Sequence, residues 1–159
     1  MRVLRWDEGR AAVDELLRAR KLEQVSASEE MAEYLLSVAA KHIESASLIA
    51  ESDPMGSYQM SYDGARKALS AVLQIQGLRP TSSGGHYVIE ECLKAQLGKT
   101  GREIVGKFSV MRRIRNDNEY PQQPEDAMAV EEALEQIIEA QLVLDGARKL
   151  VEVLPPYGS

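Results

Sequence analysis

The segment Met111–Pro121 holds the side chains whose types and spacing best suit chemistry. Three apolar residues predict the buried face of the helix that carries it: Ile104, Phe108 and Met111. At about 100° per residue, Arg115 falls within roughly 20° of that face, and Asn118 and Glu119 fall within about 60°. Polar groups at the inner end of an apolar stripe indicate a polar network, a cleft or a partner surface.

Two interpretations of Arg115 follow from its position. A buried arginine needs a partner, because an unpaired charge in an apolar setting is unfavourable. The partner is either an acidic side chain of the chain itself or a ligand in a cleft. The acid would be Glu119, four residues on, or one from the last helix. Arg112 and Arg113 are predicted to point more outward.

Other chemistries find little support in the sequence. Gly84-Gly85 lacks the spacing and the lysine of a phosphate-binding loop. Cys92, His42 and His86 are too few and too scattered for a zinc site, so no metal or cofactor is expected. A nucleophilic Cys92–His86 pair is disfavoured, because six residues place the two nearly opposite on a helix. Packing is the simplest role for His42, and capping or packing for His86.

Composition narrows the class of protein. The 159 residues suit one domain, and the net charge of −6 argues against a general, charge-driven nucleic-acid binder. A local basic patch remains: Lys107, Arg112, Arg113 and Arg115. The single cysteine fits a reducing compartment. We expect a cytoplasmic protein, since we find no membrane-length apolar run and no signal-peptide core in Met1–Asp7.

Helical spacing of apolar residues dominates the chain. We expect helices over about 8–21, 28–53, 54–76, 86–97, 100–119 and 124–153, and a loop over 79–85. The inner faces are predicted as follows: Met31, Leu35, Val38, Ala46 and Ile49; Tyr58, Tyr62, Ala65, Leu69, Val72 and Leu73; Ile89, Cys92, Leu93 and Leu97; Val130, Leu134, Ile137, Leu144 and Val151.

Long helices joined by short loops predict an all-α fold, an antiparallel four-helix bundle. Its main helices would start near Ser28, Pro54, Thr100 and Pro124, and the helix at His86 would be an extra short one. Residues 1–25 would form an N-terminal helical extension, 26–154 the bundle, and 155–159 a flexible tail.

The chain resembles the HEPN family of small helical bundles. The resemblance lies in Arg115-Asn116-Asp117-Asn118-Glu119-Tyr120-Pro121, in the alanine-rich Tyr62–Leu69 helix and in Gly85-His86 opening a short helix. It covers about residues 27–152. It implies a homodimer whose motifs face each other across a cleft, and metal-independent ribonuclease activity in active members. Many members are toxins paired with a nucleotidyltransferase-like antitoxin or belong to defence systems, and others bind nucleotides or partners without cleavage.

The chain departs from the family motif at its histidine, because Glu119 and Tyr120 occupy that place. We therefore expect an RNA- or nucleotide-binding protein with weak or no nuclease activity. Arg115 would hold a phosphate with its planar fork and Asn116 would orient it. Glu119 and Tyr120 complete the candidate catalytic set, with Arg112, Arg113 and Asn118 as candidate ligand-binding residues. The alternative is a non-catalytic helical dimerisation or protein-interaction module.

Overall fold

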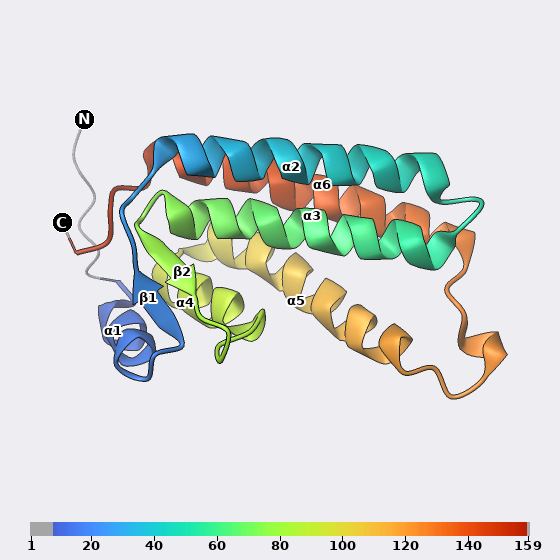
Figure 1. Ribbon diagram of the computed structural model, residues 1–159, viewed down its shortest axis with the longest axis horizontal. Helices are drawn as coiled ribbons and strands as arrows, with labels where there is room; N and C mark the ends of the chain where they lie inside the picture. Colours follow the sequence, from blue (N-terminus) through green and yellow to red (C-terminus); the bar gives the residue numbers. More distant parts are fainter. Residues whose placement is uncertain (1–7, 159) are drawn as a thin grey trace.

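The computed structural model describes residues 8–158, which form a mostly helical protein (Figure 1). Four long helices make up most of it: α2 Glu29–Ile49, α3 Pro54–Gln74, α5 Lys99–Glu119 and α6 Val130–Val153. The shorter elements are α1 Arg10–Arg18, β1 Leu22–Gln24, β2 Leu78–Pro80, α4 Tyr87–Gln96 and the 3-10 turn η1 Pro124–Asp126. The all-α prediction is therefore confirmed at the level of fold class, apart from a two-stranded ribbon.

The helices α2, α3 and α6 lie alongside one another, and α5 crosses below α3 at an angle (Figure 1). Ser28 caps α2, since its hydroxyl accepts a hydrogen bond from the Met31 amide at 3.0 Å. Asp53 caps α3 through the Gly56 amide at 2.9 Å, with Pro54 in the first turn. The α2–α3 boundary thus follows the capping signals of the sequence.

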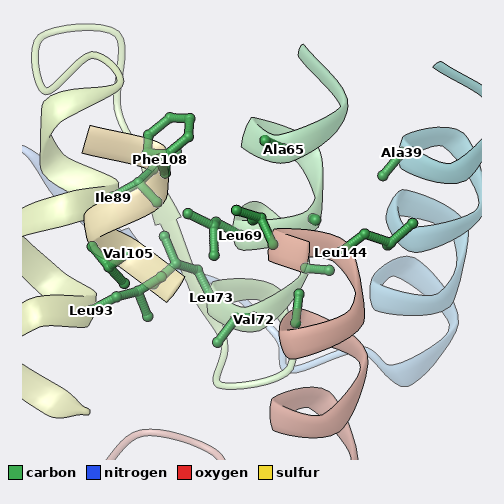
Figure 2. Close-up of a cluster of buried hydrophobic side chains, with 14 of the residues drawn as sticks. Ala39, Ala65, Leu69, Val72, Leu73, Ile89, Leu93, Val105, Phe108 and Leu144 are labelled. Atoms are coloured by element: carbon green, nitrogen blue, oxygen red, sulfur yellow. The ribbon is translucent and has the colours of Figure 1, made fainter. Parts of the chain in front are cut away.

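Small residues bring these helices close together. Alanine recurs every seven residues in the buried face of α2, at 32, 39 and 46, and in that of α6, at 133, 140 and 147. A Cβ on Gly64 of α3 would lie 3.1 Å from the Ala39 carbonyl oxygen, so the α2 and α3 backbones nearly touch. Figure 2 shows the adjoining core, where Leu69, Leu73, Leu93 and Phe108 meet.

The alanine faces correct two predicted stripes. On α2 the larger side chains Met31, Leu35 and Val38 flank the interface, and Met31 is 45% exposed. On α6 Leu134 is likewise 45% exposed, although it was predicted to lie in the seam. The buried faces hold Leu36 and Ile43 on α2 and Val143 on α6 beside the alanines, so each predicted stripe is partly displaced around its helix. The faces predicted for α3 and α4 are buried as expected.

The predicted long C-terminal helix is also interrupted. Pro124 begins only the short turn η1, Ala127 and Ala129 are extended, and α6 starts at Val130. Met128 between them is buried.

The ribbon of β1 and β2 was not predicted. Leu22 pairs with Pro80 and Gln24 with Leu78 in antiparallel register, so part of the expected 79–85 loop is a strand. Gly77 turns the chain into β2 at φ 78°, and a Cβ there would meet the Val25 carbonyl oxygen at 2.7 Å. The ribbon fastens the N-terminal segment to the end of α3.

Both ends of the described part of the chain pack on the helices. Val13 of α1 is buried in the shared core, and α1 lies against α4. The Tyr157 amide donates to the Gln76 carbonyl at 2.8 Å, and its hydroxyl donates to Asp14 at 2.6 Å. The division at residue 25 and the flexibility of the tail stay predictions. Residues 1–7 of the expected extension and Ser159 lie outside the described part.

A buried amide pair joins the ends of α3 and α4. The Gln96 side-chain amide donates to Gln76 Oε1 at 2.7 Å, and Gln76 donates back to Gln96 Oε1 at 3.1 Å. Both side chains are almost completely buried. Each amide thus satisfies the other where water does not reach.

We predict that Gln96→Leu lowers stability by about 1–3 kcal/mol, because Gln76 Oε1 loses its donor while buried. The melting temperature should fall by roughly 2–4 °C per kcal/mol in a domain of this size. The double variant Gln76→Leu/Gln96→Leu should recover most of the loss, since neither amide is then stranded. Circular dichroism melts test this, and a double variant no more stable than the single one would contradict it.

Candidate functional site

An open cavity of about 350 Å³ lies between α3, the loop before α4, the start of α4 and the end of α5. We call it the cationic cavity, after the two arginines in its wall. Its lining residues are Tyr62, Gly84, Gly85, His86, Tyr87, Arg112, Arg115 and Asn116. Three of the predicted site residues therefore meet in one place.

Arg115 lies in the wall of this cavity with its side chain 28% exposed. Its guanidinium carbon is 5.3 Å from the centre of the Tyr62 ring, within the range of a cation–π contact. Its Nη1 is 3.3 Å from Oε2 of Glu119, so the intrahelical pair foreseen from the spacing is present. Because Glu119 is 42% exposed, this pair is close to solvent and adds little stability.

Arg112 was predicted to point outward, but its side chain turns inward toward α4. Its Nε donates to Oε2 of Glu90 at 2.6 Å, and its guanidinium carbon is 5.2 Å from the centre of the Tyr87 ring. The Glu90 side chain is only 1% exposed. A buried carboxylate needs a cation, and this requirement turns Arg112 inward toward α4. The helix period of α5 alone could not reveal a partner on another helix.

His86 brings a histidine to the cationic cavity from outside the motif. Its Nδ1 is 2.7 Å from the Tyr62 hydroxyl, and the two ring centres are 5.6 Å apart. Burial, together with the charges of Arg66 and Arg115, holds the pKa of His86 below its ordinary value. Burial also raises the pKa of Tyr62 to about 12, although Arg115 opposes the shift. Near neutral pH the pair is therefore an uncharged imidazole against a protonated phenol.

The β1–β2 ribbon positions the loop that carries His86. The Thr81 amide donates to the Lys21 carbonyl at 2.9 Å, and its hydroxyl donates to the Arg20 carbonyl at 2.6 Å. A Cβ on Gly84 would lie 2.5 Å from the Lys21 carbonyl oxygen, so only glycine allows this contact. His86 was expected to cap or pack, and the Gly84-Gly85 pair before it was the available signal for a close approach.

The other predicted site residues lie around the cavity rather than in its wall. Glu119 forms an ion pair with Arg115, and Tyr120 is 77% exposed at the end of α5. Arg113 is exposed and bonds the Ser109 carbonyl of its own helix, at 3.4 Å. Asn118 likewise donates to the Ile114 carbonyl at 2.8 Å. Their assignment to the site stays a prediction.

The remaining histidine, His42, and the single cysteine, Cys92, lie outside the cationic cavity. His42 is half-buried on α2, and its Nε2 faces Asp63 at 3.3 Å. Burial alone would raise the pKa of Asp63, but hydrogen bonds from Lys67 and Arg66 outweigh it and lower the pKa. Cys92 is buried, which raises the pKa of its thiol to about 12. That thiol is a poor nucleophile near neutral pH.

Within residues 8–158, no group of three or more His, Cys, Asp or Glu side chains is placed to hold a metal ion. No helix in this part of the chain is both long and apolar enough to cross a membrane. Comparisons with protein families, curated proteins and solved structures found no match to this chain.

The two arginines should differ in their contribution to folding. We predict that Arg112→Ala destabilises the protein by about 3 kcal/mol or more, because it strands the buried Glu90 carboxylate. Arg115→Ala should reduce stability by roughly 1 kcal/mol, since its acidic partner is exposed and only the contact with Tyr62 is lost. Thermal melts of the two variants side by side test the difference. Equal melting temperatures would contradict it.

Proposed function

We propose that this chain is a HEPN-like protein that binds RNA or a nucleotide through a phosphate group in the cationic cavity. One observation carries the proposal: Arg112 and Arg115 each rest on a tyrosine ring in the wall of a single cavity, with His86 beside them. Guanidinium groups held in this way present planar N–H donors, which match the geometry of phosphate oxygens.

The charge distribution supports a local site. The whole chain carries −6, so long-range attraction cannot bring nucleic acid to every face of the protein. Binding would depend on a few specific contacts and would have a shallow dependence on salt concentration. The helical bundle, with the Arg-Asn motif near the end of α5, is compatible with the HEPN resemblance.

Arg115 and Arg113 offer a matched pair of variants for testing the proposal. Both lie near the end of α5, but Arg113 is exposed and does not line the cationic cavity. We predict that Arg115→Ala weakens binding of a single-stranded RNA oligonucleotide by about tenfold or more, the equivalent of 1.4 kcal/mol. Arg113→Ala should change binding no more than about twofold.

Fluorescence anisotropy with a labelled oligonucleotide measures both affinities. Circular dichroism spectra and melts of the two variants confirm that each remains folded. If the two variants lost RNA affinity equally, binding would depend on diffuse surface charge, and the proposal would be wrong.

His86 favours a second candidate function, slow cleavage of RNA without a metal. The expectation of weak or no cleavage rested on the missing motif histidine, and His86 brings a histidine to the cavity from another part of the chain. In the tautomer whose Nδ1–H donates to the Tyr62 hydroxyl oxygen, Nε2 is unprotonated and would take the proton of a ribose 2′-hydroxyl. The 2′-oxygen would then attack phosphorus, and the 5′-oxygen would leave with a proton from water, giving a 2′,3′-cyclic phosphate.

This function predicts slow, EDTA-resistant cleavage that is lost in His86→Gln and retained in Arg113→Ala. Because the base must be unprotonated, the rate should rise with pH through the pKa of His86 and then level off. That pKa is lowered by burial and by nearby arginine charges, so the midpoint of the rise should lie below the ordinary histidine pKa of about 6.5. Cleavage that survives His86→Gln would rule out His86 as the base.

Homodimerisation and pairing with an antitoxin or a nucleotidyltransferase stay predictions of the resemblance. The alternative function, a non-catalytic interaction module, is supported by a row of exposed apolar side chains on α6. Leu134, Ile138 and Leu142 are 45%, 61% and 44% exposed at four-residue spacing. A row of this kind on one helix suits contact with another helix.

A further inference from the structure

A second and larger hollow, of about 590 Å³, adjoins the cationic cavity. The two share Gly85 and His86 in their walls, so the His86 residue stands between them. The larger one, which we call the base hollow, is formed by the start of α2, the second half of α3, β2 and the loop that follows. Both volumes fall in the range of small-molecule sites, roughly 300–1,000 Å³.

The walls of the base hollow differ from those of the cationic cavity. Apolar side chains form a large part of its surface: Val25, Met31, Leu35, Leu78, Pro80 and Ile89. Short polar side chains lie among them: Ser70, Gln74, Thr81 and Ser82. Its two arginines are engaged by acids, Arg66 by Asp63 and Arg79 by Glu23. Apolar walls with a few hydrogen-bonding groups suit a flat heterocycle.

The cationic cavity suits an anionic phosphate, and the adjoining base hollow suits a flat, largely apolar ring. We infer that the site takes a nucleoside phosphate, with its phosphate in the cationic cavity and its base in the base hollow. The sugar would then pass His86, whose imidazole can hydrogen-bond a ribose hydroxyl. This inference rests on the proposed function and adds that the nucleoside, and not the phosphate alone, is recognised. The nucleoside phosphate is either a free nucleotide or the phosphorylated end of an RNA.

Ser70 provides a way to close the base hollow without touching the arginines. It is half-buried on α3, and its hydroxyl bonds only the Arg66 carbonyl of its own helix, at 2.9 Å. Phenylalanine at this position would fill space that the base needs. The matched control is Ser37 on α2, whose hydroxyl makes the same kind of contact with the Tyr34 carbonyl outside both hollows. Ser82→Phe, on the exposed loop, is a second blocking variant that spares the helices.

Isothermal titration calorimetry with four probes tests the inference: inorganic phosphate, adenosine, adenosine 5′-monophosphate and a 5′-phosphorylated RNA hexamer. The native chain should bind adenosine monophosphate or the phosphorylated hexamer at least about tenfold more tightly than phosphate or adenosine. Ser70→Phe and Ser82→Phe should lose that advantage yet bind phosphate within about twofold of the native chain. Ser37→Phe should behave as native.

The possible outcomes distinguish recognition of the nucleoside from the phosphate binding of the proposed function. Tight binding of the monophosphate identifies a free nucleotide as the ligand, and tight binding of the hexamer alone identifies an RNA end. Phosphate binding that depends on Arg115, with no nucleotide advantage, would overturn the inference and leave the proposed function standing. Adenosine binding as tightly as its monophosphate would also overturn it. If the native chain bound none of the four probes, both would fall.

Discussion

The Tyr62 ring joins the apolar core to the cationic cavity. It is 2% exposed and stacks on Phe108 of α5, with ring centres 5.4 Å apart. The same residue holds the His86 imidazole through its hydroxyl and lies beneath the Arg115 guanidinium. A single buried side chain on α3 therefore contacts both α5 and the loop before α4, and it fixes where Arg115 and His86 lie. Core packing sets the geometry of the site, because moving the ring would disturb the contact between α3 and α5.

The cationic cavity lies where the helices diverge, on the opposite side of α3 from the close packing with α2 and α6. The helices α2, α3 and α6 approach one another through alanine and Gly64, whereas α5 crosses α3 at an angle and packs against α4 (Figure 1). The end of α5 thus faces the loop before α4. Tyr58 anchors this arrangement, since its buried hydroxyl donates to the Met111 carbonyl of α5. The polar end of α5 faces a cavity because the bundle is tight on one side and splayed on the other.

The sequence predicted features that depend on local spacing and missed those that depend on distant partners. The α3 face and the helix starts near Ser28 and Pro54 follow from periodicity and side-chain chemistry, and the structure has them. A three-residue ribbon has no periodic signal, so the pairing of residues 22–24 with 78–80 could not be foreseen. The inward turn of Arg112 likewise requires Glu90, 22 residues earlier. His86 was visible as a residue, but its approach to Arg115 is a property of the fold.

The two arginines carry equal charge but are not equivalent as ligand-binding groups. Arg112 is bound to a carboxylate that is only 1% exposed, and releasing it would leave that carboxylate buried and unpaired. Arg115 is paired with Glu119, which is 42% exposed and can turn into water at little free-energy cost. In the proposed function, a phosphate would therefore replace Glu119 as the partner of Arg115, while the Arg112–Glu90 pair keeps α4 and α5 together. The buried pair maintains the shape of the cavity, and the exposed pair leaves one guanidinium available for exchange.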